Sequence, residues 1–168
     1  MKTKRLVRMA LLTAVALSVF LIESRLPALA PIPGIKLGLA NIVTVWVLFM
    51  LGPKDAGLIL LARILLGSLF CGSVTTLIYS MSGGLLCYIV SILLRRLLDE
   101  SKIWVVSIIG AMAHNIGQLC AATAVMHSFA IWSYAPILLI SAIITGAFTG
   151  VAAQLLYNRL NDIPHFKD

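Results

Sequence analysis

Charged residues are scarce in this chain. They make up 11% of its 168 residues, less than half of the roughly 25% that is usual in soluble domains. The apolar content is correspondingly high at 61%, and the mean hydropathy is +1.05. This composition excludes a soluble globular domain. Because a spanning helix needs about 20 apolar residues, the length allows about six spans, and we expect one integral membrane domain over residues 1–168.

Motifs for metal binding, ATP hydrolysis and nucleophilic catalysis are absent as well. Three widely spaced cysteines form no CxxC pair and no metal-binding spacing with histidine. There is no GxxxxGK[ST] phosphate loop, so any ATP-driven step would need separate ATPases. His114 is the one histidine expected at mid-membrane depth, and no acid shares that depth for a Ser/His/Asp arrangement. We therefore expect no metal, no cofactor and no catalytic centre.

The apolar runs and the breaks between them predict an all-α bundle of six transmembrane helices. We place the spans at about residues 6–24, 37–52, 55–71, 74–95, 103–127 and 134–157. The first run continues past the length of a signal peptide, to about Ser24, and has no Ala-x-Ala exit before its charged residues, so we expect it to be retained as a span.

The basic residues predict the orientation of this bundle. One side of it receives Lys2, Lys4, Arg5, Arg8, Lys54, Arg95, Arg96, Lys102, Arg159 and Lys167. The other side receives only Arg25 and Lys36. Because Lys and Arg accumulate in cytoplasmic loops, both termini are expected in the cytoplasm. The net charge of +7 thus reflects topology and not a nucleic-acid partner.

Polar side chains interrupt the fifth span. His114 and Gln118 are four residues apart and share one helical face, which also carries small residues, whereas Asn115 points about 100° away. Polar groups at bilayer depth are costly and usually face a bundle interior or a water-filled cavity. A satisfied core histidine is one interpretation of His114; three polar groups within five residues favour a ligand site.

Arg63 and Asn41 place further polar groups at similar depth. Arg63 lies in the middle of the third span, too deep to reach either surface easily, and Gly67 one turn further is expected to clear space beside it. No acid is expected there, because Asp55 lies at the inner end of its span and Glu23 at the outer end of its own. The missing partner of Arg63 is then either a substrate anion or a set of amide and backbone oxygens.

The connection between the first two spans contains three prolines within seven residues, from Pro27 to Pro33. Proline excludes a regular helix there. Two alternatives remain: a stiff interfacial hairpin with solvated charges, or a lid over a pocket to which Lys36 adds positive charge. Together, Lys36, Asn41, Arg63, His114, Asn115 and Gln118 predict an outward-facing binding pocket for an anionic or amide-rich small molecule.

Small residues recur at the spacing of helix contacts. Gly146 and Gly150 form a GxxxG pair on the sixth span, which favours close helix packing in lipid. Ala10 and Ala14 form a second row near the inner end of the first span. That row fits ordinary packing or a docking groove for another membrane subunit.

Several segments resemble the "Gx transporter" family, whose members are often labelled heptaprenyl diphosphate synthase component I. They are residues 31–41 (PIPGIKLGLAN), Arg63 with Gly67, residues 82–85 (SGGL) and residues 110–118 (GAMAHNIGQ). The likeness covers most of the chain. That family looks like the S components of energy-coupling-factor vitamin transporters, six-helix proteins with both termini inside. In S components a small-residue row on the first helix contacts the transmembrane coupling subunit, and Ala10 with Ala14 fits that pattern.

The resemblance implies a multi-pass protein of a bacterial cell membrane, surrounded by lipid. We expect a substrate-binding subunit of an uptake transporter, with a small-molecule substrate and a transmembrane coupling subunit with ATPases as partners. The alternative is a non-catalytic accessory subunit of heptaprenyl diphosphate or quinone biosynthesis. A catalytic synthase is excluded, because such enzymes hold magnesium ions with clustered aspartates, and the four aspartates here form no cluster.

Overall fold

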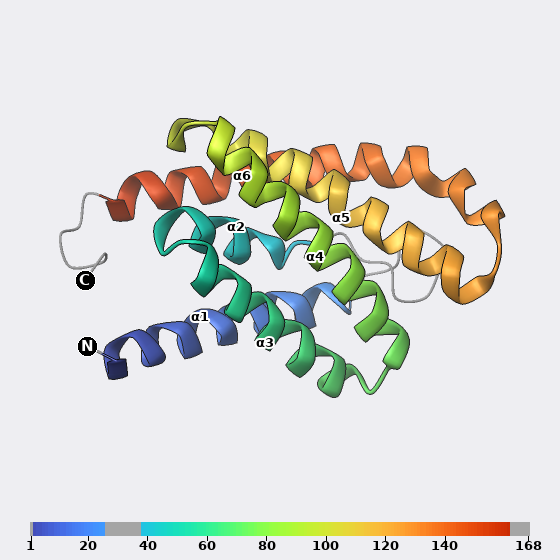
Figure 1. Cartoon of the computed structure of the whole chain (residues 1–168), viewed down its shortest axis with the longest axis horizontal. Helices are drawn as coiled ribbons and strands as arrows, with labels where there is room; N and C mark the ends of the chain where they lie inside the picture. The colour runs from blue at the N-terminus through green and yellow to red at the C-terminus, as the bar shows by residue number, and fades with distance from the viewer. Residues whose placement is uncertain (1, 26–37, 162–168) are drawn as a thin grey trace.

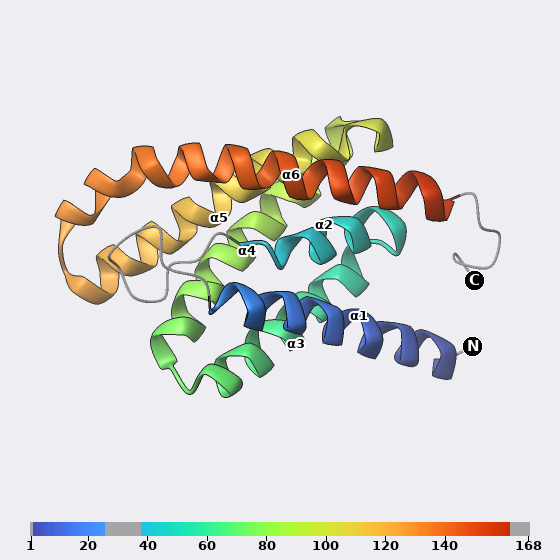
Figure 2. The same ribbon diagram turned by 180° about the vertical axis from the view of Figure 1, so that it is seen from behind.

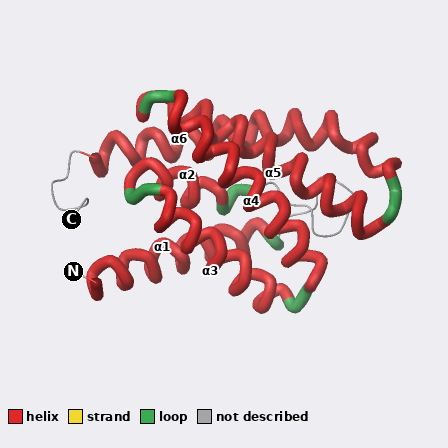
Figure 3. Tube along the Cα trace, viewed as in Figure 1, coloured by secondary structure: helices red, strands yellow, loops and turns green. Residues whose placement is uncertain are grey.

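The structure, a computed structural model, describes residues 2–25 and 38–161. Within these residues all regular secondary structure is helical (Figure 3). The α-helices are α1 (Lys2–Glu23), α2 (Asn41–Met50), α3 (Pro53–Cys71), α4 (Val74–Leu97), α5 (Ile103–Met126) and α6 (Ala135–Asn161). Short 3-10 helices, η1 (Glu100–Lys102) and η2 (Phe129–Tyr134), precede α5 and α6.

Four of the described helical segments are long and apolar enough to cross a membrane. They are Thr3–Glu23, Val74–Leu97, Glu100–Met126 and Phe129–Asn161. Helix α3 has 19 residues but includes Lys54, Asp55 and Arg63. Helix α2 differs from the expected span over 37–52: it begins only at Asn41, after Gly38 with its positive φ of 79°. Its ten residues cover about 15 Å, half the thickness of a bilayer core.

The helices form a bundle with α2 at its centre (Figures 1 and 2). Helices α4, α5 and α6 pack one on the next along one side, and α1 packs on α3 along the other. The start of α1 and the end of α6 lie at the same end of the bundle, at the left in Figure 1. We call this the termini end; α3 begins there and α4 ends there.

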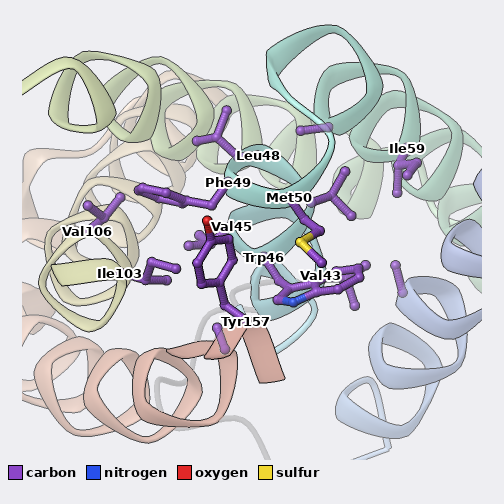
Figure 4. Close-up of a cluster of buried hydrophobic side chains, with 14 residues drawn as sticks. Val43, Val45, Trp46, Leu48, Phe49, Met50, Ile59, Ile103, Val106 and Tyr157 are labelled. Atoms are coloured by element: carbon purple, nitrogen blue, oxygen red, sulfur yellow. The ribbon is translucent and has the colours of Figure 1, made fainter. Parts of the chain in front are cut away.

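Helix α2 is apolar on every side, which explains its central place. Nine of its ten residues are buried, as expected for a helix without a polar face. Its side chains pack among residues of α3, α5 and α6 (Figure 4), including Ile59, Ile103, Val106, Ala153 and Tyr157. In lipid such a core is held by close van der Waals packing, because the surrounding tails are as apolar as the core itself.

The GxxxG pair on α6 makes the contact expected of it. A Cβ atom on Gly146 would lie 2.8 Å from the Cα of Ile108, and one on Gly150 would lie 2.7 Å from the Cα of Trp104. Both distances are too short for any side chain, so α6 and α5 approach through their backbones. The prediction of close packing at this pair is confirmed.

The opposite face of α6 is apolar and exposed. Ile140, Ile144, Phe148, Val151 and Leu155 are all between 51% and 73% exposed. A large exposed apolar surface of this kind is rare on a soluble monomer. On a helix of spanning length it is the surface that meets lipid tails, so the faces of α6 divide between protein and membrane.

Candidate functional site

Asn41 and Arg63, expected at similar depth on different spans, are in contact. Asn41 opens α2, and Arg63 lies in the middle of α3. The Arg63 Nη2 group donates a hydrogen bond of 3.4 Å to the Asn41 Oδ1 atom. Both side chains are buried, with exposed fractions of 2% for Arg63 and 7% for Asn41.

Gly38 joins this pair to His114 on α5. A Cβ atom at Gly38 would lie 2.9 Å from Asn41 Nδ2 and 3.0 Å from His114 Cδ2. The Gly38 carbonyl also accepts a hydrogen bond of 2.9 Å from the Asn41 backbone N–H. With its positive φ, Gly38 turns the chain into α2 and leaves its backbone between the two polar side chains.

The Gly83–Gly84 pair of α4 forms another wall of the site. A Cβ atom on Gly83 would lie 2.9 Å from both His114 Cε1 and Gln118 Cγ. One on Gly84 would lie 3.8 Å from Arg63 Nη2. His114 and Gln118 therefore share one face of α5, as their spacing indicates, and that face lies on α4. Arg63 is near enough to His114 to act on it electrostatically.

Glu23 was missed by the sequence reasoning, and the expectation that no acid lies near Arg63 is wrong. The Glu23 side chain is only 4% exposed. Its Oε1 atom accepts a hydrogen bond of 2.5 Å from the Gly38 N–H, and its charge acts on Arg63. Because α1 packs on α3, the end of α1 lies beside Arg63 and not at a solvated surface. The available signal was that Glu23 is the only acid in the first 54 residues.

Phe20 fills the space that Gly67 was expected to leave beside Arg63. A Cβ atom on Gly67 would lie 2.6 Å from Phe20 Cε1. The Phe20 ring in turn lies under the Arg63 guanidinium, 5.7 Å from its carbon to the ring centroid, within the range of a cation–π contact. The glycine thus admits an aromatic ring of the protein and not a ligand.

The remaining predicted residues lie elsewhere. Asn115 is buried and donates a 2.7 Å hydrogen bond to the Leu138 carbonyl of α6, so its amide faces α6 and does not join Arg63. Lys36 lies outside the described residues. Ala10 and Ala14 are exposed on α1.

Three buried nitrogen atoms of the site have no hydrogen-bond partner among the described residues. They are Asn41 Nδ2, Arg63 Nε and His114 Nδ1. A buried polar atom left unpaired costs about 1–3 kcal/mol, so such atoms are uncommon unless a bound group satisfies them. The unpaired nitrogens of the Asn41 amide and the Arg63 guanidinium can only donate. A group complementary to these two atoms would therefore carry acceptor oxygens.

Long apolar helices, an exposed apolar surface and polar side chains in the interior define this chain as a helical membrane protein. Residues 12–156 match the sequence model of the family described as heptaprenyl diphosphate synthase component I. The chain belongs to that family. A search of curated proteins and a search of solved structures each gave no match.

Proposed function

We propose that the chain is a membrane-embedded substrate-binding subunit of a small-molecule uptake transporter, similar to an S component. The observation that carries this proposal is the set of unpaired buried nitrogen atoms. Asn41 on α2 contacts Arg63 on α3 and lies with His114 of α5 beside Gly38, and each of the three side chains has one nitrogen without a partner among the described residues. A ligand site requires polar side chains from several helices to converge, whereas a surface that only contacts lipid does not.

The charges of Arg63 and Glu23 indicate which anionic or amide-rich ligands suit the site. Glu23 offsets part of the Arg63 charge, so the site has less excess positive charge than Arg63 alone would give it. A multiply charged anion would be repelled by the Glu23 carboxylate. We therefore favour a ligand that presents amide carbonyl oxygens or a single carboxylate, with Gln118 supplying further hydrogen bonding.

The same proposal includes six membrane segments with both termini in the cytoplasm, of which α2 is a short central one. Two features support it: α1 begins and α6 ends at the same end of the bundle, and that end receives most of the basic residues. A transmembrane coupling subunit with ATPases docks on the exposed Ala10 and Ala14 of α1. Since the chain has no phosphate loop, energy for uptake comes from that partner.

The family description favours a second function. A component I that lacks clustered aspartates fits a non-catalytic accessory subunit of heptaprenyl diphosphate or quinone biosynthesis. In that case a lipid diphosphate would occupy the Arg63 site, against the charge of Glu23. Affinity purification from native membranes separates the two functions: a coupler with ATPases supports transport, and a soluble aspartate-rich synthase supports the accessory role.

The ligand test uses the His114→Ala variant with Arg159→Gln as control, since Arg159 is exposed on α6. Small molecules retained by each gently purified protein are identified by mass spectrometry and titrated back. The proposal requires that the His114 variant folds, by its unfolding temperature, and loses the ligand. A variant that folds and binds as the control does would refute it.

A further inference from the structure

A hollow lies at the termini end of the bundle, between α2, α3 and α4. Its volume is about 180 Å³, and it is lined by Leu48, Pro53, Ile92, Arg95 and Arg96. Two consecutive arginines from the last turn of α4 thus meet apolar side chains of neighbouring helices. Among the described residues, the lining contains no carboxylate. A basic hollow with apolar walls matches a group that is anionic at one end and apolar at the other.

Arg95 is held in place by an aromatic ring. Its guanidinium carbon lies 5.7 Å from the centroid of the Phe49 ring at the end of α2. A guanidinium that stacks on the face of an aromatic ring still has its N–H groups directed outward in the guanidinium plane. Those N–H groups remain free to bind oxygen atoms. Phe49 therefore orients the donors of Arg95 without neutralising their charge.

Arg96 makes no hydrogen bond, ion pair or ring contact with any residue in 2–25 or 38–161. It is exposed at the end of α4. The ion pair that the described residues do contain joins Arg5 to Asp55, on α1 and α3. The two guanidiniums of the hollow are thus available to an external anion.

A larger hollow of about 510 Å³ adjoins this one and shares Arg95. It is also lined by Asp99 and Glu100, and the Glu100 carboxylate accepts a hydrogen bond from the Tyr157 hydroxyl. Carboxylates repel an anion, so the larger hollow does not suit one. The charge pattern assigns an anion to the smaller hollow alone.

We propose that the hollow lined by Arg95 and Arg96 binds a phosphate group. Planar guanidiniums match phosphate oxygens with paired hydrogen bonds, and basic pockets between helices at the cytoplasmic side of a membrane protein recognise anionic headgroups. Leu48, Pro53 and Ile92 provide the apolar wall that the glycerol and upper acyl carbons of a phospholipid would contact. This site is separate from the Arg63 site. Its cytoplasmic placement rests on the proposed topology, but it does not depend on the ligand proposed for Arg63.

The test measures binding to the detergent-purified full-length chain by native mass spectrometry. The probes are phosphatidylglycerol, phosphatidylcholine with the same acyl chains, and inorganic phosphate. We expect saturable one-to-one binding of phosphatidylglycerol that falls about fivefold in Arg95→Gln and about fivefold in Arg96→Gln. Arg159→Gln, which removes an exposed arginine from the same end, is the matched control and is expected to bind as the original chain does.

Inorganic phosphate identifies the source of the group. If it binds alone with the same dependence on Arg95 and Arg96, the site is confirmed as one for free phosphate; if only the lipid binds in this way, it is confirmed as a headgroup site. Should Arg95→Gln fail to fold through loss of its Phe49 contact, Arg96→Gln still gives the answer. Equal binding of phosphatidylcholine, an equal loss in Arg159→Gln, or no loss in either site variant would overturn the proposal.

Discussion

Replacing Arg63 with Gln is expected to destabilise the protein strongly, because the change leaves the Glu23 carboxylate buried without a cation beside it. Both side chains are nearly inaccessible, at 2% and 4% exposed, and the charge of Glu23 acts on Arg63. Leaving one of two such buried charges uncompensated costs about 3–5 kcal/mol. Glu23→Gln is expected to cost a similar amount from the other side. Its amide oxygen still accepts the Gly38 N–H bond, so this variant isolates the charge.

The double variant Glu23→Gln/Arg63→Gln removes both charges at once. Its loss of stability is expected to fall short of the sum of the single losses by about 0.5–3 kcal/mol, the range for residues whose interactions are coupled. Unfolding by SDS in mixed micelles, followed by helical circular dichroism, measures all three variants against Arg159→Gln. Additive losses would refute the charge interaction on which this description of the site depends.

Three further predictions follow from the packing. His114→Leu removes an unpaired nitrogen, so it is expected to change the unfolding free energy by less than about 1 kcal/mol and to abolish stabilisation by the ligand. Asn115→Leu breaks the hydrogen bond to α6, so it is expected to lower the unfolding free energy by about 1–2 kcal/mol. The Asn115 variant is expected to keep its stabilisation by the ligand. The reverse pattern in melting curves with and without ligand would contradict both roles. Gly38→Ala is expected to cost about 1–2 kcal/mol through its positive φ and to weaken binding, measured by titration; full affinity would argue against the contact with His114. Gly150→Leu is expected to separate α6 from α5 and to lower the unfolding free energy by about 1–3 kcal/mol. The control, Ile144→Leu on the lipid face, is expected to leave the unfolding free energy unchanged.

The sequence predicts the parts of this fold that depend on local pattern. Apolar runs and polar breaks locate the ends of α3, α4 and α5 to within a few residues. They do so because the apolar side chains along each helix must contact either other helices or lipid. The four-residue spacing of His114 and Gln118 correctly predicts a shared face, because the period of a helix is fixed. The GxxxG pair predicts its backbone contact for the same reason.

The features that sequence reasoning missed depend on how helices tilt and rotate against each other. The sequence places Glu23 at the outer end of its span, whereas the packing of α1 on α3 buries the carboxylate where its charge acts on Arg63. The sequence suggests open space beside Gly67, but Phe20 of α1 fills that space. Which face of α1 meets α3 cannot be deduced from the sequence of either helix alone. The length of α2 was overestimated because a buried apolar helix and a spanning one have the same composition.

Native mass spectrometry of the gently purified chain tests the central claim most directly, namely that Arg63, Asn41 and His114 hold a small molecule. The account predicts one small molecule of defined mass, rich in acceptor oxygens, on each copy of the original chain. It also predicts loss of that mass from the His114→Leu variant, which is expected to keep its fold. A chain that carries no small molecule from its native membrane, or a folded His114→Leu variant that keeps the same mass, would contradict it.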